Sequence, residues 1–158
     1  MFVVRLTRWT IMTYQSNEFD AEVEFQGPGY AEMLAKCKFC QIIANGETLC
    51  YQDEHVVAFK DIKPVAQQHF LVCPKRHIKN VNALTPAHGP LLKHMHKVAN
   101  QLLGEVPAAK VGFHRVLSTS VDHLHMHAFE LPFKSCYIAN RKYHRGYFLD
   151  IQKIYDRL

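Results

Sequence analysis

Apolar and polar residues alternate in short runs along the chain, and this pattern predicts strands on either side of one helix. Leucine, methionine and valine recur at helical spacing through residues 91–103, so this segment is expected to form a helix with one apolar face. A proline at position 86 or 90 fits its first turn, and Gly104 ends it. A second helix is expected within residues 147–158. The expected strands cover residues 48–53, 55–61, 69–74, 110–117 and 121–131.

The order of these elements indicates the class of fold. Strands precede and follow one central helix, and few of them are separated by the helical crossovers that join parallel strands. The sequence therefore predicts an α+β domain with a mainly antiparallel sheet. A turn at residues 26–30 separates an N-terminal extension, residues 1–30, from one domain over residues 31–158. Residues 37–44 are expected to form a short helix or turn, stopped by Asn45-Gly46.

Composition and charge place the chain among ordinary globular proteins. Hydrophobic residues make up 48% and charged residues 21%. No apolar run approaches the ~20 residues of a membrane span, so no membrane partner is expected. The net charge of +5 favours anionic ligands such as nucleotides or nucleic acid. No block of like charges strengthens that preference.

The cysteines and the first residues bear on the compartment. Five cysteines is an odd number, and the N-terminus lacks the apolar core and cleavage site of a secretory signal. We therefore expect reduced thiols and a cytoplasmic or nuclear location. The first segment carries two arginines and no acid before Glu18, so a mitochondrial presequence is the less favoured alternative.

Three histidines in "DHLHMHAF" (residues 122–129) dominate the candidate chemistry. Within a strand, His123, His125 and His127 lie on one face, while the residues between them face the core. Imidazole acts as a metal ligand, a general base or a nucleophile. Adjacent positions on one strand do not converge easily on one ion. A nucleophile flanked by hydrogen-bond donors fits the spacing better than a three-histidine metal site.

The same residues carry a resemblance to a known family. "HLHMHAF" resembles the His-x-His-x-His-x-x pattern of the histidine triad superfamily, and "CKFCQIIANGE" and "YQDEHVVAFKDIKPVAQQHFLVCPKRHIKNV" are similar to its upstream segments. The resemblance covers residues 37–129, and the tail resembles the third, adenosine phosphoramidase-like type of the Hint branch. It implies the histidine triad fold: an antiparallel sheet with a long central helix, a zinc-linked N-terminal turn and a C-terminal helix.

The resemblance also implies roles for individual residues. His125 is expected to attack the α-phosphorus of a nucleotide and form a covalent nucleotidyl-imidazole, while His127 donates to the phosphate. Asp61 is expected to bind the ribose hydroxyls with Ile62 beside the base, and His69 to support the triad. The implied catalytic residues are Ser120, His125 and His127. The implied nucleotide-binding residues are Asp61, Ile62, His69, His125, Met126 and His127.

The pair Cys37-x-x-Cys40 is ambiguous between zinc, redox chemistry and no function when taken alone. It lacks the setting of a thioredoxin-like motif. The resemblance implies His77 and His123 as two further ligands, which completes a closed, structural zinc site. No organic cofactor is expected. Cys50, Cys73 and Cys136 are interpreted as small core residues, and His94 and His96 as surface residues.

The resemblance implies hydrolysis of adenosine 5'-monophosphoramidates, including the lysyl-AMP type, with release of AMP and an amine. An aprataxin-like DNA-adenylate hydrolase is the first alternative; the basic charge favours it, but no second Cys/His cluster follows residue 129. A dinucleoside polyphosphate hydrolase is a weaker one. A nucleotide- or partner-binding module with little turnover is the non-enzymatic alternative, and the intact middle histidine argues against it. Gly112, His114 and Ser118 stand where the family has a glycine-rich loop and an asparagine, which leaves leaving-group specificity open.

The expected partners are a purine nucleotide and a second copy of the chain, with nucleic acid less favoured. The resemblance implies that two protomers join their sheets through the central helix and the strand at 110–117. Leu92, Met95 and Val98 would then be only partly buried within one chain.

Overall fold

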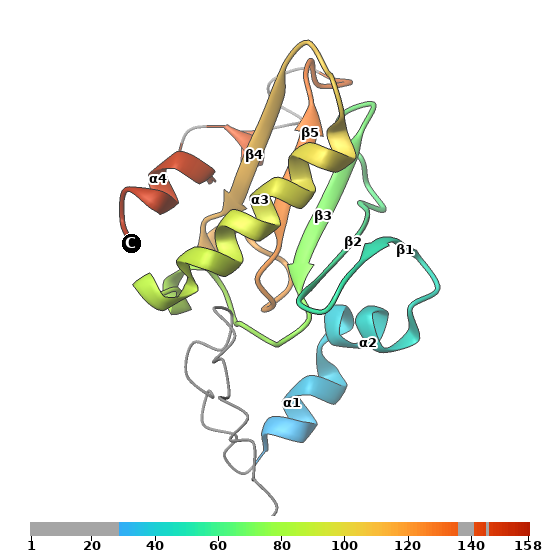
Figure 1. The fold of residues 1–158 in the computed structure, drawn as a ribbon, viewed down its shortest axis with the longest axis vertical. Coiled ribbons are helices and arrows are strands. Elements are labelled where there is room, and N and C mark those ends of the chain that lie inside the picture. Colours follow the sequence, from blue (N-terminus) through green and yellow to red (C-terminus); the bar gives the residue numbers. More distant parts are fainter. Residues whose placement is uncertain (1–28, 136–140, 145) are drawn as a thin grey trace, which may run out of the picture.

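The computed structural model describes residues 29–135, 141–144 and 146–158, and its centre is one six-stranded sheet (Figure 1). The strand order is β1-β2-β3-β5-β4-β6, and every neighbouring pair is antiparallel. The strands are β1 (Leu49–Gln52), β2 (Val56–Lys60), β3 (His69–Pro74), β4 (Ala109–His114), β5 (Met126–Glu130) and β6 (Phe148–Asp150). The helices are α1 (Tyr30–Lys36), α2 (Lys38–Asn45), α3 (Gly89–Leu103) and α4 (Ile151–Tyr155). This confirms the predicted α+β class. The predicted extension lies, up to residue 28, outside the described residues, as does Cys136.

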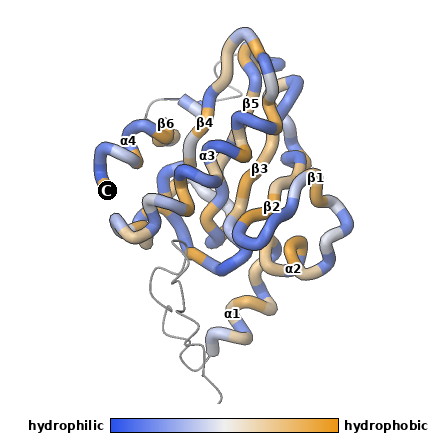
Figure 2. Tube along the Cα trace, viewed as in Figure 1, coloured by the Kyte–Doolittle hydropathy of each residue, from blue (hydrophilic) through white to orange (hydrophobic). Residues whose placement is uncertain are grey.

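The central strands are apolar on both faces because both faces are covered. In Figure 1 the long helix α3 runs across one face of the sheet, and in Figure 2 β3 is hydrophobic along most of its length. The face under α3 carries Val56, Ala58, Phe70, Val72, Met126 and Ala128. The opposite face carries Val57, Phe59, Leu71 and Cys73, which pack against Phe39 of α2. The second of these faces also carries the histidines of the candidate site.

Helix α3 begins at Gly89 with Pro90 in its first turn, as predicted, but its apolar face is fully used within the chain. Leu92 and Met95 have no exposed surface, and Val98 is 1% exposed. The expectation that these residues are only partly buried in one protomer is therefore wrong. No helix of the described part is long and apolar enough to cross a membrane.

The outer edge of β4, the other half of the expected dimer surface, is partly occupied within the chain. Residues Gly112–His114 pair with β6 of the same chain. Two sheets cannot join along that stretch while β6 holds its backbone groups. A homodimer stays a prediction, and β6 leaves only Ala109–Val111 of this β4 edge open to a second copy.

The C-terminal segment differs from the single helix predicted for residues 147–158. Phe148–Asp150 forms β6, and only Ile151–Tyr155 is α-helical. The side chain of Asp150 accepts a hydrogen bond from the backbone N–H of Gln152, which makes Asp150 the N-cap and sets the start of the helix. The strand predicted at 110–117 likewise ends at His114, where the chain enters a 3₁₀ turn, Val116–Ser118.

Gly112 permits the close approach of β6 to β4. A Cβ atom at this position would collide with the backbone carbonyl oxygen of Leu149 and press on the ring of Phe148. We expect Gly112→Ala to lower the free energy of unfolding by about 1–3 kcal/mol, because backbone atoms must shift. Urea denaturation measures this, with Gly89→Ala as control, since a Cβ at Gly89 meets no atom within 4 Å. Equal losses in both variants would contradict the steric argument.

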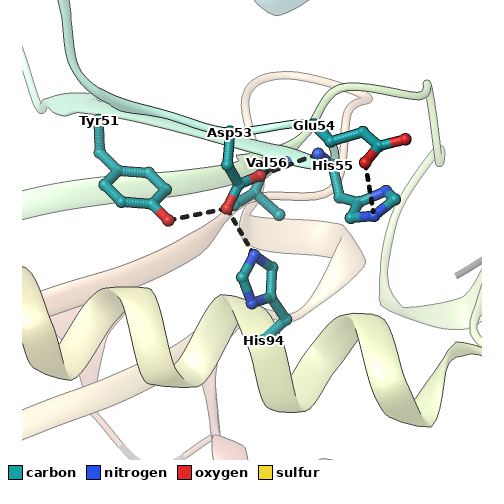
Figure 3. Close-up of polar contacts among 6 residues, drawn as sticks. All are labelled: Tyr51, Asp53, Glu54, His55, Val56 and His94. Atoms are coloured by element: carbon teal, nitrogen blue, oxygen red, sulfur yellow. Dashed lines mark hydrogen bonds and ion pairs between the residues drawn. The ribbon is translucent and has the colours of Figure 1, made fainter. Parts of the chain in front are cut away.

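The turn between β1 and β2 is tied to α3 by one carboxylate (Figure 3). One oxygen of Asp53 accepts from the backbone N–H groups of His55 and Val56. The other lies 2.8 Å from the Tyr51 hydroxyl and 2.6 Å from Nε2 of His94. These bonds lower the pKa of Asp53 to about 2, against the opposing effect of burial. The predicted hairpin is confirmed.

The minor interpretations have mixed outcomes. His94 and His96 are half-buried and bonded, His94 to Asp53 and His96 through Nδ1 to the Tyr155 hydroxyl at 3.2 Å. Cys73 is buried as expected, whereas Cys50 is exposed. Helix α2 confirms the turn predicted at 37–44 and ends at Gly46, whose φ is 72°. Helix α1 was not predicted.

Candidate functional site

The histidine motif enters the sheet later than the sequence predicts. Strand β5 begins at Met126, so His123 and His125 lie in the irregular segment before it. The pairing of β5 with β3 ends at Val72, two positions before Pro74, which has no N–H to donate to the ladder. Leu124, Met126 and Ala128 nevertheless face the core under α3, as expected. The side chain of Met126 is fully buried in this core, so only its backbone is placed to contact a nucleotide, and its nucleotide-binding role stays a prediction.

His125 presents one ring nitrogen whose electron pair is free. Its Nδ1 lies 2.6 Å from the carbonyl oxygen of His123, so Nδ1 carries the proton and Nε2 does not. The ring is 8% exposed and meets the ring of Phe39 edge to face at 5.0 Å. Burial lowers the pKa of His125, although the bond to His123 and the charge of Asp61 oppose this. A neutral imidazole with an unprotonated Nε2 is the form that attacks phosphorus.

A chain of hydrogen bonds assigns the opposite tautomer to His127. The backbone N–H of Val65 donates to Nδ1 of His69 at 3.4 Å, so His69 carries its proton on Nε2. That Nε2 lies 2.9 Å from Nδ1 of His127, which must accept. The proton of neutral His127 is therefore on Nε2, a buried atom with no partner in the described part of the chain. His127 has a donor to offer, as its predicted role requires.

Asp61 stands at the other end of this chain. One of its carboxylate oxygens lies 3.6 Å from Nε2 of His69, and the other accepts from the backbone N–H of Lys63. Ile62, beside it, is 93% exposed. An exposed apolar side chain next to a carboxylate is consistent with the predicted contacts to a base and a ribose. The predicted support of the triad by His69 is visible in its bond to His127.

Four site residues were missed by the sequence reasoning. His114 packs its ring 4.5 Å from that of His127 and is 7% exposed, and Tyr143 covers both rings. Neither ring nitrogen of His114 has a partner of good hydrogen-bond geometry among the described residues. Burial lowers the pKa of His114, and backbone groups of Tyr147 and Lys142 oppose that shift. His114 had a signal, since it stands where the family pattern has asparagine. Lys142, Tyr143 and Phe39 had none.

Lys142 gives this face of the sheet a positive field. After burial, which is the larger effect, its ammonium lowers the pKa values of His69, His114, His125 and His127. Four neutral imidazoles beside a cation make a pocket suited to an anion such as a phosphate group.

Ser120 is placed less favourably than predicted. It is exposed, and no hydrogen bond joins it to the triad among the described residues. The small cavity against His125 is lined by Thr119 instead. The hydroxyl of Thr119 donates to the carbonyl oxygen of Val121.

The predicted zinc ligands come together at the junction of α1 and α2. Nδ1 of His123 lies 3.6 Å from the sulfur of Cys37 and 3.4 Å from that of Cys40, and Nδ1 of His77 lies 3.4 Å from Cys40. All four ligand atoms lie within 4.8 Å of one another. A tetrahedral zinc ion with Zn–S of ~2.3 Å and Zn–N of ~2.1 Å places sulfur and nitrogen roughly 3.6 Å apart. The donor set and its spacing fit zinc.

Two further features fit a cation in this cluster. Nε2 of His123 lies 2.9 Å from the carbonyl oxygen of Pro74, so its proton is there and Nδ1 is free to bind a metal. Burial and the neighbouring Cys37 raise the pKa of Cys40 to about 12. A thiolate pair in that setting needs a positive charge beside it, which a zinc ion supplies. His123 would then connect the metal to His125 through its carbonyl oxygen.

The neutral histidines predict acid sensitivity. Burial lowers the pKa of His114 from 6.5 to about 4, with His69 shifted in the same way. Between these pH values the unfolded chain binds more protons than the folded one. The free energy of unfolding is therefore highest above pH 6.5 and falls as the pH is lowered toward 4. At ~1.4 kcal/mol per pKa unit, His114 alone accounts for a loss on the order of 2–3 kcal/mol. Urea denaturation from pH 7 to 4.5 measures it.

His114→Asn is the matched variant for this measurement. The side chain at position 114 is not a zinc ligand in the wild type or in the variant, so loss of metal at low pH affects both proteins equally. The variant should be less stable at pH 7 but lose less on acidification. The same slope in both chains would contradict the assignment of a neutral His114.

The geometry agrees with comparisons to known proteins. Residues 36–143 match the family model described as "Scavenger mRNA decapping enzyme C-term binding". A relative from Arabidopsis thaliana, the bifunctional adenosine 5'-phosphosulfate phosphorylase/adenylylsulfatase HINT4, is 47% identical over 61% of this chain and 71% of its own. The adenosine 5'-monophosphoramidase HINT3 of Xenopus tropicalis is 35% identical over 58% of this chain and 65% of its own.

Two other proteins extend the comparison. Aprataxin from Danio rerio is 35% identical over 68% of this chain, but the match spans only 36% of aprataxin. Among solved structures, a HIT family hydrolase from Clostridium thermocellum superposes with a TM-score of 0.57, at 33% identity over 64% of this chain and 95% of its own. With the family model covering more than half of its length, the chain belongs to the histidine triad superfamily of nucleotide hydrolases, in its Hint branch.

Proposed function

We propose that this protein cleaves adenosine 5'-monophosphate from a leaving group on the α-phosphorus, through a covalent AMP–histidine at His125. The observation that carries the proposal is the division of tautomers in the motif. His125 has an unprotonated Nε2, whereas His127, two residues away, has a protonated one. One side chain is set to attack phosphorus, and the other is set to donate to a phosphate oxygen as charge builds there.

The reaction has two displacements. The electron pair of His125 Nε2 forms a bond to phosphorus, and the bond from phosphorus to the leaving atom breaks. The leaving group departs with that electron pair, and a leaving amine takes a proton from solvent. Positive charge on the His125 ring is stabilised by the carbonyl oxygen of His123, which accepts a hydrogen bond from Nδ1–H. Water then attacks phosphorus, loses its proton, and releases AMP with His125 restored.

The other residues bind and orient the nucleotide. Asp61 accepts hydrogen bonds from the ribose hydroxyls, Ile62 lies beside the base, and Lys142 adds positive charge near the phosphate. Ser120 stays a proposal for the contact to the leaving group. Zinc would be held by Cys37, Cys40, His77 and His123, and when bound it joins α1 and α2 to the segment before β5.

The leaving group we propose first is an amine, as in adenosine 5'-monophosphoramidates, including lysyl-AMP. Similarity to HINT3, named for that activity, supports it. The higher identity to HINT4 supports sulfate as a second leaving group on the same phosphorus, since that relative is named for activities on adenosine 5'-phosphosulfate. Both reactions share the covalent step at His125 and differ only in the bond that breaks.

A second candidate function is removal of AMP from adenylated nucleic acid. Similarity to aprataxin supports it, together with exposed lysines near the site, Lys38 and Lys79. It ranks second because the match covers 36% of aprataxin, so most of that protein has no counterpart here.

One experiment separates these functions. Turnover of adenosine 5'-phosphoramidate, lysyl-AMP, adenosine 5'-phosphosulfate, adenylated DNA and diadenosine triphosphate is measured side by side at equal concentrations. We expect the phosphoramidates to give the highest kcat/KM. A phosphosulfate or adenylated DNA preference would reassign the leaving group and leave the nucleophile in place. No turnover of any of them would leave a nucleotide-binding module and contradict the proposal. We propose a cytoplasmic or nuclear location for this activity.

A further inference from the structure

The cysteine pair of the metal cluster lies in a setting that also suits a disulfide bond. Cys37 is the residue at which α1 ends and α2 begins, and Cys40 lies in the first turn of α2. Side chains three positions apart on a helix are neighbours, with Cβ atoms roughly 5–6 Å apart. The sulfur atoms of the pair lie within 4.8 Å of each other. A local movement at the start of α2 therefore brings them to the ~2.05 Å of a disulfide bond.

Both cysteines can be reached from outside the cluster. Cys37 lines a groove of about 900 Å³, and Cys40 lines a second hollow of about 460 Å³ on another face of α1. Both residues are half-buried, so neither is sealed in the core. Helix α1 buries none of its own residues and projects from the body of the molecule in Figure 1. A small molecule in the groove or in the hollow therefore lies next to one of the two cysteines.

The charges along the groove favour a small neutral reagent over a charged one. Its lining includes three lysines, of which Lys36 is paired with Glu32 at 2.6 Å, and it includes Asp122 as well. Charges of both signs attract neither a cation nor an anion strongly. Hydrogen peroxide is neutral, is little larger than water and oxidises accessible thiolates. A hydroperoxide is therefore the class of oxidant that this opening suits.

A zinc ion and a disulfide exclude each other in this cluster. Zinc binds the thiolate form of cysteine, whereas the sulfurs of a disulfide carry no charge. A disulfide between the cysteines leaves only His77 and His123, whose rings lie edge to face at 4.9 Å. Two imidazoles are too few for a closed tetrahedral site. Oxidation of the pair must therefore release the metal.

We propose that Cys37 and Cys40 form a redox switch, in which a hydroperoxide converts the zinc-bound thiolates into a disulfide and releases zinc. One thiolate attacks a peroxide oxygen, and the O–O bond breaks to give a sulfenic acid and hydroxide. The second thiolate attacks that sulfur, the S–O bond breaks, and a second hydroxide leaves. The two sulfurs lose two electrons, which the peroxide oxygens gain, and zinc leaves as Zn²⁺. A dithiol restores the thiols by exchange, and zinc binds again.

The effect of the switch on turnover rests on the proposed function. The carbonyl oxygen of His123 lies 2.6 Å from Nδ1 of His125 and fixes the orientation of that ring. Without zinc, His123 loses the bond from its Nδ1 to the metal, and the segment before β5 is held less firmly. The oxidised protein should therefore have a kcat roughly tenfold lower than the reduced one, since the nucleophile is less well oriented.

The test uses the full chain loaded with zinc and carrying Cys50→Ser and Cys136→Ser, so that the pair and the buried Cys73 are the thiols that remain. Hydrogen peroxide is added without substrate, and zinc release is followed with a chromophoric chelator. Tryptic peptides are then analysed by mass spectrometry without reduction. Because trypsin cuts after lysine, a disulfide within the pair appears as peptide 37–38 linked to peptide 39–60.

We expect the linked peptides and about one equivalent of zinc to appear with the same time course, because a closed site holds one ion. Dithiothreitol with added zinc should reverse both changes. Cys37→Ser in the same background is the control for the linkage: its remaining Cys40 has no partner in the pair, so peptide 39–60 should be oxidised without being linked to peptide 37–38.

Four results would overturn the switch: zinc retained after the disulfide has formed, a disulfide to Cys73 instead, no oxidation of the pair by peroxide that oxidises free cysteine, or a purified chain without zinc. Neither readout needs substrate, so a chain that forms the disulfide and releases zinc but turns over no nucleotide would contradict the proposed reaction alone. An unchanged kcat in the oxidised, zinc-free protein would overturn the coupling to turnover.

Discussion

His125→Asn should abolish turnover while the protein keeps its fold and its affinity for AMP. Asparagine has no nitrogen with an available electron pair to attack phosphorus, so the two-step route is closed. Loss of a sole nucleophile lowers kcat by on the order of 10⁴-fold or more. His127→Asn should lower kcat less, by roughly 10²–10³-fold, because it removes one hydrogen-bond donor to the developing charge and leaves the nucleophile. Single-turnover kinetics on the preferred substrate gives both values.

His96→Asn is the matched control for this substitution. His96 is a half-buried histidine on α3, on the opposite side of the sheet, bonded to the Tyr155 hydroxyl. The His96→Asn variant should keep kcat within about twofold, since a substitution near the surface and away from the site has little effect on the fold that holds the site. If His125→Asn keeps more than a trace of activity, the covalent route is wrong.

The covalent intermediate is open to direct capture. Acid quenching would hydrolyse a phosphorus–nitrogen bond on histidine, so the reaction with α-phosphate-labelled substrate is stopped in base. The label should then be found on the peptide that contains residues 123–127, and on His125 within it. Label on His114, the fourth histidine of the pocket, would transfer the nucleophilic role to a residue that the sequence reasoning did not propose.

Much of the fold could be predicted because its signals are local. The hairpin at Asp53, the helix opened by Pro90 and the stop at Gly46 each depend on residues within a few positions of the feature. The late start of β5 depends instead on Pro74, which is distant in sequence and becomes adjacent only when β3 and β5 pair. The strand β6 was misread as helix because its partner surface, opened by Gly112, is visible only in three dimensions.

The candidate site divides in the same way. His69, His125 and His127 could be assigned from a motif. The structure joins His69 to His127 by a hydrogen bond and places the ring of His125 beside that of His127. Tyr143 and Lys142 belong to a segment that folds back over β4, and no local pattern marks them. The alternation of a strand also placed the side chains of Leu124, Met126 and Ala128 in the core, and the structure has them there.

Replacing Cys37 or Cys40 should remove zinc and destabilise the whole N-terminal half of the site. Elemental analysis of the wild type should give about one zinc per chain, as a closed four-ligand site holds one ion. Cys40→Ser removes the sulfur that lies within 3.4 Å of both His77 and His123. The metal then has too few ligands for a closed tetrahedral site, and the free energy of unfolding should fall by about 3–5 kcal/mol, since zinc binding is coupled to folding.

Activity should fall along with the metal, because His123 connects the two sites. Its Nδ1 faces the cysteines, and its carbonyl oxygen holds Nδ1 of His125. A loosened His123 lets the His125 ring rotate, so kcat should drop by roughly tenfold or more while KM changes little. Cys50→Ser is the control: Cys50 is an exposed thiol outside the cluster, and its variant should keep zinc, stability within ~0.5 kcal/mol, and kcat. A wild type that carries no zinc, or a Cys40→Ser variant as stable and active as Cys50→Ser, would mean that the four ligands meet without holding a metal.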